Sequence, residues 1–411
     1  MLDTRRTDSN PARRAGEGVA FAYEVRVPVE HSYPVLYRAG LLADYGRELA
    51  GTLGPRRVCV LSDRRVWRLY GERLVAALAP LAPRERTPAA DGEPGSAGSP
   101  LLLVPPGEGS KSMATFARLL DRMAELGVDR RSLLVNFGGG VISDLGGFLA
   151  SAYMRGIEYA NLSTSLLGQV DACVGGKVAV NARVAKNLIG AFHHPVHVAG
   201  DPELLASLSE RDFRCGLAEA IKVAIICGPE LFATLERERE AVQARDPRVL
   251  VSVIGEASKL KMDLIARDPY EGDLRRPLNL GHTIGHPIET EFGYRRIRHG
   301  EAVAIGTAVA SAVALRRGML AADVAERIFA LLESYGLLAF PLPIDARRVV
   351  GHLRYVRMIR GHRLHFVLPR DVGAVTITDE LDGEELVQGF ADWQDRARHA
   401  PRSPRSNGRP G

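Results

Sequence analysis

The sequence predicts an α/β domain followed by a mostly helical domain. In the first half of the 411 residues, short apolar runs alternate with amphipathic helical patterns, as in a parallel sheet covered by helices. From about residue 204 onward, long helical patterns replace the strand patterns. We therefore expect an α/β domain over 19–200 and a helical domain over 201–390, with disordered tails at 1–18 and 391–411.

Individual elements follow from local patterns. Three near-continuous apolar runs predict strands over 57–62, 101–104 and 133–137. Between the first two, residues 87–100 are rich in Pro, Gly, Ala and Ser, which indicates an exposed insertion. Apolar residues at helical spacing predict a helix over 112–126 that ends at Gly127. In the second domain, a helix is expected over 299–317, closed by Gly318.

The charge and the cysteines restrict the function classes. Lys and Arg exceed Asp and Glu by 54 to 49, but the excess lies in residues 1–18 and 393–411, so the body between them is formally neutral. A nucleic-acid-binding surface would need a basic stripe, and the neutral body therefore argues against one. No apolar run reaches the ~18–20 residues of a membrane helix, and no secretory signal is visible. The four cysteines form no Cys-x-x-Cys pair, which is typical of the cytoplasm. We expect a cytoplasmic protein without nucleic-acid or membrane partners.

A glycine-rich loop follows the third predicted strand. Residues 138–147 read GGGVISDLGG and lead into a helical pattern. Glycines let the backbone approach a phosphate, and a helix N-terminus favours anions. The spacing is not that of the Gly-x-Gly-x-x-Gly dinucleotide motif. A tight structural turn and a pyrophosphate site both remain open.

A second segment, 163–195, combines lysine and asparagine with glycine. Lys177 and Lys186 supply point charges, while Asn181 and Asn187 supply neutral hydrogen-bond donors. The segment therefore suits an anion, although a polar surface loop would explain any single lysine. Further along the chain, a basic cluster gathers five residues: Lys259, Lys261, Arg275, Arg276 and Asn279. Ion pairing with nearby aspartates is the simpler explanation for its exposed members.

Histidines at helical spacing suggest a metal site. His282 and His286 lie four residues apart, on one face of a helix expected to begin near Gly281. His299 follows, and Glu219 shares a helix face with Lys222 over 213–227. Two imidazoles and a carboxylate can hold a divalent ion and leave a position for substrate. The spacing is not His-Glu-x-x-His, so histidines satisfied within the core remain the alternative.

Together these residues resemble the dehydroquinate synthases, the type member of the sugar phosphate cyclases. The matching strings run in family order across about 100–305. They are PGE (106–108) with Lys111 and Ser112, GGGVISDLGGF (138–148), YMRG (153–156), LLGQVDACVGGK (166–177), KNLIGAF (186–192), GLAEAIK (216–222), LNLGHTIGHPIE (278–289) and HGEAV (299–303).

The resemblance implies a fold and a set of site residues. The fold would be a Rossmann-like NAD-binding domain followed by a helical metal-binding domain, with the active site between them in a homodimer. The metal ligands, for Zn²⁺ or Co²⁺, would be Glu219, His282 and His299. The NAD site would be lined by Asp63, Glu108, Lys111, Gly139, Gly140, Asp144, Thr164, Ser165, Lys177 and Lys186. Substrate would contact Asp171, Lys177, Asn187, Lys222, Lys261, Arg275, Asn279 and His286, and Arg155 would reach the neighbouring subunit's site.

The resemblance also implies a reaction. A 3-dehydroquinate synthase of the shikimate pathway converts 3-deoxy-arabino-heptulosonate 7-phosphate to 3-dehydroquinate and phosphate. NAD oxidises the substrate transiently, phosphate is eliminated, the hydride returns, and an intramolecular aldol reaction closes the ring. Two alternatives remain: a secondary-metabolism cyclase acting on an amino analogue or on sedoheptulose 7-phosphate, and a metal-dependent NAD polyol dehydrogenase.

Several positions depart from the family pattern. Ser163 and Ser165 stand in a stretch where Pro-Thr-Thr is usual, and Val178 replaces a threonine. An Asp-Lys-Lys triplet near the C-terminus is missing, and Arg357 offers only a similar charge. These changes put the standard substrate in question. The retained pattern of Leu278, Asn279, His282 and His286 argues against a valiolone-type cyclase, because the resemblance implies that those relatives alter it. Lys261 and Arg275 likewise favour a substrate that bears a carboxylate.

Overall fold

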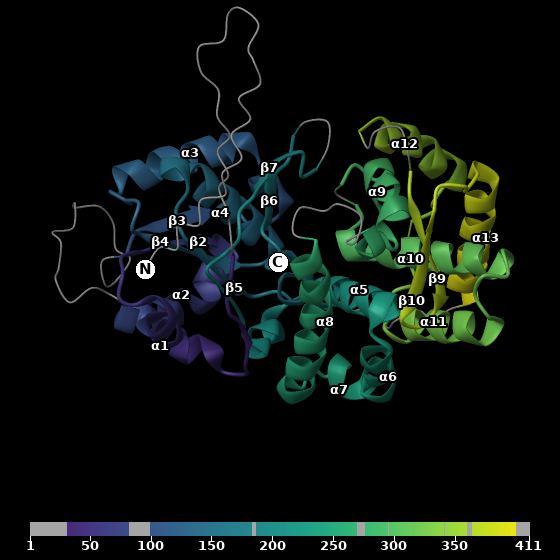
Figure 1. Ribbon diagram of the computed structural model, residues 1–411, viewed down its shortest axis with the longest axis horizontal. Coiled ribbons are helices and arrows are strands. Elements are labelled where there is room, and N and C mark those ends of the chain that lie inside the picture. The colour runs from purple at the N-terminus through teal and green to yellow at the C-terminus, as the bar shows by residue number, and fades with distance from the viewer. Residues whose placement is uncertain are drawn as a thin grey trace, which may run out of the picture. The chain divides into compact units, whose positions relative to one another are not determined.

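The computed structural model describes residues 31–81, 99–182, 186–268, 276–294, 296–340, 342–359 and 364–399. The chain divides into the units Met1–Ser32 and Tyr33–Gly411, and every helix and strand discussed below belongs to the second unit. Figure 1 shows an α/β part and a helical part within this unit. The predicted fold class is therefore confirmed. The boundary at 200/201 stays a prediction, because both parts belong to one compact unit.

A six-stranded sheet in which all paired strands are parallel forms the centre of the α/β part. Its strands, in spatial order, are β1 (Val35–Tyr37), β8 (His197–Gly200), β5 (Tyr159–Ser163), β4 (Leu133–Gly138), β2 (Val58–Asp63) and β3 (Leu101–Val104). Every residue of β4 and β5 is buried, which explains their unbroken apolar runs. The three strands predicted from the sequence are confirmed as β2, β3 and β4.

Helices cover both faces of this sheet (Figure 1). They are α1 (Leu41–Leu53), α2 (Arg64–Leu78), α3 (Met113–Glu125) and α4 (Gly140–Ala152). Alternate residues of β2 point to opposite faces: Val58 and Val60 pack with α1 and α2, whereas Cys59 and Leu61 pack with α3 and α4. The predicted helix over 112–126 is confirmed as α3, whose N-cap is Ser112.

A short hairpin and a π-helix lie between β5 and β8. The hairpin consists of β6 (Lys177–Val180) and β7 (Ile189–Phe192), paired antiparallel. The π-helix Gly168–Ala172 follows β5. Elsewhere in the described residues, short 3-10 turns lie at Ala79–Leu81, Glu108–Ser110, Tyr153–Arg155, Pro202–Ser207 and Arg276–Asn279.

The helical part is built around α10. Its elements are α5 (Glu210–Cys227), α6 (Pro229–Arg237), α7 (Arg239–Gln243), α8 (Pro247–Arg267), α9 (His282–Glu291), α10 (His299–Arg316), α11 (Ala322–Ser334), α12 (Ala346–Ile359), α13 (Gly383–His399) and the antiparallel pair β9 (Phe366–Asp371) and β10 (Ala374–Thr378). Small residues on α10 allow close packing. A Cβ at Gly300 would lie 2.3 Å from the carbonyl oxygen of Cys215 on α5, and a Cβ at Gly306 would lie 2.1 Å from that of Gly281 before α9. The predicted helix at 299–317 is confirmed as α10.

The C-terminal helix corrects one prediction. Residues 391–411 were expected to be a disordered basic tail, but α13 continues to His399. Leu386, Phe390 and Trp393 recur at helical spacing and are buried in the core, which holds the helix in place. Its Arg396 is not a solvated tail charge, because it pairs with Glu326 at 2.7 Å. Residues 400–411, the tail 1–18 and the main part of the predicted insertion, 87–98, lie outside the described residues.

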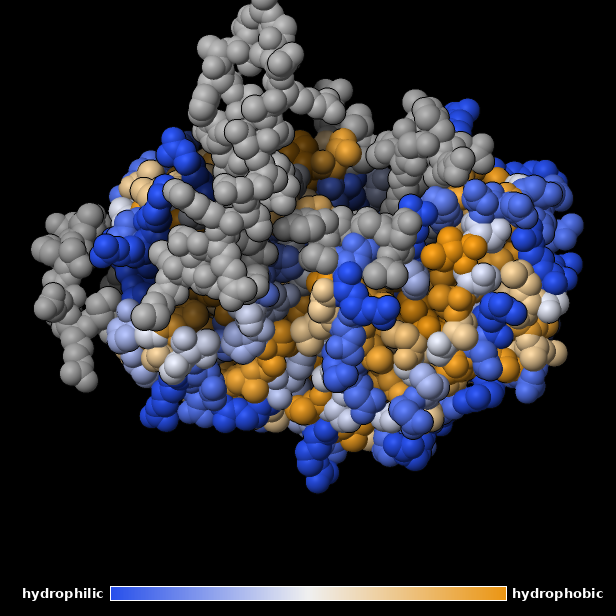
Figure 2. All heavy atoms as spheres, viewed as in Figure 1, coloured by the Kyte–Doolittle hydropathy of each residue, from blue (hydrophilic) through white to orange (hydrophobic). Residues whose placement is uncertain are grey.

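The surface of the helical part carries matched charges. Several of its arginines pair with carboxylates, as in Arg316 with Asp392 at 2.5 Å and Arg317 with Glu385 at 2.6 Å. On the face shown in Figure 2, hydrophilic and hydrophobic residues are interleaved. Among the described residues, no helix is both long enough and apolar enough to cross a membrane.

Candidate metal and anion site

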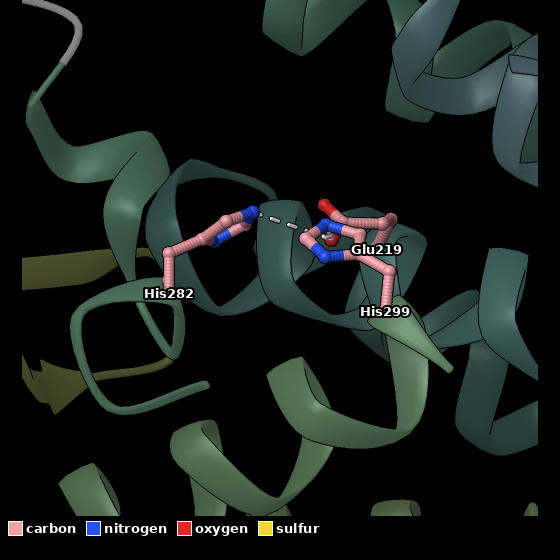
Figure 3. A group of neighbouring side chains, drawn as sticks. All are labelled: Glu219, His282 and His299. Atoms are coloured by element: carbon pink, nitrogen blue, oxygen red, sulfur yellow. Dashed lines mark ion pairs between the residues drawn. The ribbon is translucent and has the colours of Figure 1, made fainter. Parts of the chain in front are cut away.

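Three helices bring one acid and two histidines to a common point. Glu219 lies in the middle of α5, whereas His282 and His299 are the first residues of α9 and α10. The close approach of α5 and α9 to α10 places these positions side by side. Figure 3 shows the two imidazoles pointing toward the carboxylate of Glu219. The residues that the resemblance assigned to the metal are therefore neighbours in space.

The distances between these side chains suit a shared cation. Glu219 Oε1 lies 3.6 Å from His282 Nε2 and 3.5 Å from His299 Nε2. Two ligand atoms about 2.1 Å from one ion at a tetrahedral angle lie about 3.4 Å apart. Glu219 is only 1% exposed, and Oε1 has no hydrogen-bond partner among the described residues. A buried carboxylate oxygen without a partner is costly, and a divalent ion at this point would satisfy it.

Lys222 binds the other carboxylate oxygen of Glu219, Oε2. The two residues lie one turn apart on α5, and Lys222 Nζ donates a hydrogen bond to Glu219 Oε2. Burial alone would raise the pKa of Glu219, but Lys222 and the two histidines hold it well below its usual range. Burial would likewise lower the pKa of Lys222, yet Glu219 and Asp171 keep it raised. Both groups therefore stay charged although they are buried.

The two histidines are held differently. Burial and the nearby Lys222 lower the pKa of His282 well below its ordinary value, so this imidazole is neutral. Its Nδ1 lies 3.2 Å from the carbonyl oxygen of Leu280, which fixes the proton on Nδ1 and leaves the Nε2 lone pair facing Glu219. Burial would also lower the pKa of His299, but the neighbouring carboxylates of Glu219 and Glu289 raise it to about 10. The two carboxylates therefore favour a positive charge at this ring, which a metal ion in place of the proton on Nε2 would supply.

A charged pair links the π-helix to α8, next to the group formed by Glu219, His282 and His299. Lys261 Nζ lies 2.7 Å from Asp171 Oδ1 and also donates to the carbonyl oxygen of Asp171. Burial raises and Lys261 lowers the pKa of Asp171, which stays below its ordinary value. The sequence left open whether the basic cluster pairs with nearby aspartates. Lys259 does so, with Asp263 at 3.0 Å, whereas Lys261 pairs across to the α/β part.

The glycine loop lies where two neighbouring strands end. Gly138 ends β4 opposite Ser163, the last residue of β5, and Gly139 is the N-cap of α4 without a side-chain cap. A Cβ at Gly139 would lie 3.0 Å from Ser165 Oγ, so Gly139, Gly140, Thr164 and Ser165 line one edge of the sheet. The carboxyl ends of parallel strands are a usual place for a nucleotide. A helix N-terminus there favours a phosphate.

Polar side chains from separate segments meet beside this loop. Lys111 Nζ donates to Asp144 Oδ2 and to Asn187 Oδ1. Burial raises the pKa of Asp144, and Lys111 opposes the rise only in part. Glu108 Oε1 accepts a hydrogen bond from Asn181 at 2.7 Å. Four residues predicted at the cofactor or substrate, Glu108, Lys111, Asp144 and Asn187, are thus held around the hairpin β6–β7.

Most of the remaining predicted residues can be placed by the elements that carry them. Asp63 is the N-cap of α2, because its Oδ1 accepts from the backbone of residues 65 and 66. Lys177 begins β6 and is exposed, and Asn279 ends the 3-10 turn before α9. The ring of His286 lies with its centroid 5.4 Å from that of His282. Arg275 lies outside the described residues.

Two residues differ in position from the others. Arg155 follows the C-terminus of α4, about 20 Å along that 13-residue helix from the glycine loop. It does not join the site of its own chain, and its role in a neighbouring subunit stays a prediction. Lys186, expected at the cofactor, pairs with Glu289 of α9 at 2.9 Å.

Glu289 is a site residue that the sequence analysis did not identify. Its Oε2 lies 3.3 Å from His299 Nδ1, on the side of the ring away from the Glu219 contact at Nε2. The available signal was spacing, because His282, His286 and Glu289 follow one another at intervals of four and three residues along one helix. With His286 and His299 it forms a second group of possible metal ligands.

Both halves of the chain match one enzyme family. Residues 101–215 match the family described as 3-dehydroquinate synthase N-terminal, and residues 216–355 match the one described as 3-dehydroquinate synthase C-terminal. The chain belongs to the 3-dehydroquinate synthase family. The resemblance to the sugar phosphate cyclases is thereby confirmed, and the chain is an enzyme of this family.

Curated relatives in the 3-dehydroquinate synthase family differ in product. A 3-dehydroquinate synthase of Nostoc punctiforme is 36% identical over 369 residues, covering 88% of this chain and 97% of the relative. A 2-epi-valiolone synthase of Actinosynnema mirum is 41% identical over 363 residues, covering 85% of this chain and 90% of the relative. The chain is therefore a sugar phosphate cyclase whose specific substrate these relatives leave open.

Solved structures of cyclases share the fold. The 2-epi-5-epi-valiolone synthase of Streptomyces hygroscopicus, with NAD⁺ and Zn²⁺ bound, has a TM-score of 0.80 and 30% identity, and the match covers 91% of this chain and 100% of that one. A 2-deoxy-scyllo-inosose synthase with NAD⁺ and Co²⁺ has a TM-score of 0.76 at 23% identity, over 88% of this chain and 96% of that one, which shows the fold alone.

Proposed function

We propose that this sugar phosphate cyclase is a 3-dehydroquinate synthase, a carbon–oxygen lyase that turns 3-deoxy-arabino-heptulosonate 7-phosphate into 3-dehydroquinate and phosphate. The observation that carries the proposal is Glu219 Oε1, a buried oxygen that faces two imidazole nitrogens and has no hydrogen-bond partner among the described residues. Lys222 and Lys261 lie beside this group and suit an anionic substrate.

The residues present fit both cofactors of the proposed reaction. Glu219, His282 and His299 would hold Zn²⁺ or Co²⁺, and the glycine loop with Thr164 and Ser165 would receive NAD. When bound, the metal polarises the substrate's oxygen and NAD accepts and returns a hydride. The Zn²⁺ and NAD⁺ of the Streptomyces hygroscopicus enzyme support this assignment.

The chain's own side chains would bind and orient an anionic sugar. In this proposal Lys261 and Arg275 bind the substrate carboxylate, while Lys177, Asn187 and Lys222 receive its phosphate and hydroxyl groups. Asp171 keeps Lys261 charged and in place. The substrate carbinol is oxidised, phosphate leaves by elimination, the carbonyl is reduced again, and ring opening with aldol closure gives the carbocycle. The net reaction consumes no NAD.

A second candidate substrate follows from the relatives. The 2-epi-valiolone synthase of Actinosynnema mirum is 41% identical to this chain, which supports a secondary-metabolism cyclase that takes sedoheptulose 7-phosphate. An amino analogue of the heptulosonate is a related possibility. The carboxylate separates sedoheptulose 7-phosphate from both heptulosonates, because sedoheptulose 7-phosphate lacks the group that Lys261 and Arg275 would bind.

We also propose a cytoplasmic homodimer that serves the shikimate pathway. In such a dimer Arg155 would be supplied to the neighbouring subunit's site. Its position at the far end of α4 from the glycine loop of its own chain supports this arrangement. Sedimentation of the purified protein would test the dimer, and an Arg155→Ala variant that lost activity while remaining dimeric would support the shared site.

One experiment separates the candidates. The purified protein is incubated with NAD and Zn²⁺ or Co²⁺, and with each of the two heptulosonates and sedoheptulose 7-phosphate in turn. Phosphate release, product mass and absorbance at 340 nm are then followed. Release from the 3-deoxy-heptulosonate without NADH accumulation supports the proposal. Turnover of sedoheptulose 7-phosphate alone would replace it with a valiolone-type synthase, and steady NADH accumulation with a polyol dehydrogenase.

A further inference from the structure

We propose that Glu289 is the positioning residue of His299, and that Lys186 of the hairpin β6–β7 holds Glu289 in place. The inference rests on the proposed function, because it takes His299 to be a metal ligand. It adds a residue that touches neither the metal nor the substrate. It also links the anion-binding hairpin of the α/β part to the metal site of the helical part.

The first step of the argument is the geometry at His299. Glu289 is 1% exposed, and its Oε2 lies 3.3 Å from His299 Nδ1. The carboxylate accepts the Nδ1 proton, so Nε2, which lies 3.5 Å from Glu219 Oε1, is the nitrogen left to bind a cation. A histidine ligand whose second nitrogen donates to a carboxylate is fixed in tautomer and ring orientation, and it becomes a better donor to a metal.

The second step is the charge of Glu289. A buried carboxylate needs a partner, because transfer of an unpaired charge from water is expensive. Lys186 supplies it, since its Nζ lies 2.9 Å from Glu289 Oε1. The same ammonium lies 4.9 Å from the centre of the Tyr294 ring, a cation–π contact that fixes its position. Lys186 thus occupies one oxygen of Glu289, and His299 faces the other.

The third step is the neighbour of Lys186 in the hairpin. Asn187 accepts a hydrogen bond from Lys111, which also pairs with Asp144 of α4. Asn187 has a positive φ of 55°, and its backbone N–H donates to Asn181 Oδ1 at 3.0 Å. Consecutive residues of one loop are therefore linked to opposite sides of the site: Asn187 to the glycine-loop helix α4 through Lys111, and Lys186 directly to Glu289 of α9.

A second cation site is the alternative use of the same residues. His286, Glu289 and His299 have ligand atoms close enough to hold a second cation. Lys186 already occupies Glu289 Oε1, and a cation there would have to displace or oppose this ammonium. The positioning role accounts for both oxygens of Glu289 without a second ion, and so it is the one proposed.

The test measures metal binding rather than turnover. Full-length wild type, Glu289→Gln and Lys186→Met are stripped of metal. Zn²⁺ affinity is then measured by competition with a chromophoric chelator, and Co²⁺ loading by visible absorption and stoichiometry. Glu291→Gln is the matched control, because Glu291 lies on the same helix and pairs with His352 at 2.8 Å instead of with a predicted ligand.

We expect Glu289→Gln to bind Zn²⁺ about 10- to 100-fold more weakly and to alter the Co²⁺ spectrum. Lys186→Met should show a smaller loss, and Glu291→Gln should match wild type with one metal per chain. If Glu289→Gln does not fold, the Lys186→Met result decides.

Three results would overturn the inference. Unchanged affinity and spectrum in Glu289→Gln and Lys186→Met would refute the positioning role and leave the proposed function standing. Two metals per wild-type chain, reduced to one in Glu289→Gln, would make Glu289 a ligand. A wild type that binds no metal would overturn the proposed function together with the inference.

Discussion

Glu219 and Lys222, one turn apart on α5, form a buried pair in which the lysine takes one carboxylate oxygen and leaves the other facing two imidazoles. The lysine therefore fixes which oxygen is available to a cation. It also places a positive charge next to the proposed metal, where a substrate oxygen would bind. Its removal should separate metal binding from catalysis.

We expect Lys222→Met to lose activity without losing metal. Removal of the ammonium leaves the negative charge of Glu219 uncompensated, so Zn²⁺ affinity should stay equal or rise. Phosphate release should fall about 100-fold or more, as when a charged group at a reacting centre is lost. Metal analysis of the purified variant, together with the release assay, checks both parts. A variant that is both metal-free and inactive would contradict this division.

Metal removal should abolish the reaction reversibly. Chelation of wild type is expected to stop phosphate release, and Zn²⁺ or Co²⁺ should restore it. His282→Ala should not be restored at the same metal concentration, because one of three ligands is gone. His352→Gln, which alters a histidine paired with Glu291, is the control and should respond as wild type does. Full activity of His282→Ala in chelator would rule out the metal role of this histidine.

The carboxylate role of Lys261 has a control two residues away. Lys261→Met removes the partner of Asp171 and the proposed carboxylate contact, so kcat/KM should fall about 30-fold or more, about 2 kcal/mol or more. Lys259→Met removes only an exposed pair with Asp263, which should cost little. Steady-state kinetics of both variants decide the matter. Equal kinetics in the two would argue against a substrate role for Lys261.

The close packing of α10 against α5 can be tested by adding one methyl group. Gly300→Ala should separate the two helices, because its Cβ would lie 2.3 Å from the Cys215 carbonyl oxygen. We expect a loss of about 1–3 kcal/mol in the free energy of unfolding and weaker Zn²⁺ binding, since His299 moves with the helix. Gly255→Ala on α8 is the control, because the added Cβ would meet no other part of the protein within 4 Å. This variant should gain about 0.5–1 kcal/mol in the free energy of unfolding. Chemical denaturation gives both values.

His197 should make the fold sensitive to acid. It is buried in β8, and burial lowers its pKa from 6.5 to about 4. Between these pH values the unfolded chain binds a proton that the folded chain does not, so stability falls as the pH decreases from about 6.5 to 4. This single group accounts for about 3 kcal/mol of the loss. In His197→Leu the difference in unfolding free energy between pH 7 and pH 4 should shrink by that amount. An unchanged difference would refute the assignment.

Local patterns in the sequence were sufficient for the fold class and for several elements. The helix α3 was predicted from its apolar spacing, and α9 from the two histidines four residues apart. The end of α13 was not predicted, because its arginines were interpreted as a solvated tail. The helix is instead held by the buried side chains of Phe390 and Trp393. The spacing of apolar residues indicates which face of a helix is buried, whereas the number of charged residues alone does not show whether a segment is folded.

The site itself was predictable only through resemblance. Glu219, His282 and His299 are 63 and 17 residues apart, and the spacing alone gave no more than an open alternative. The pairs Lys261–Asp171 and Lys186–Glu289 join residues 90 and 103 positions apart, and such contacts depend on how helices pack. Glu289 was overlooked because an acid on a helix has many ordinary partners.

The left-handed backbone at Asn187 has a mechanical consequence. Asn187 belongs to a loop whose adjacent side chains reach α4 through Lys111 on one side and Glu289 of α9 on the other. A displacement of that loop as a rigid piece would disturb both attachments at once. A change in the length or stiffness of this loop should therefore affect the proposed nucleotide site at α4 and the proposed metal site at α9 together. Neither site can be altered through this loop without affecting the other.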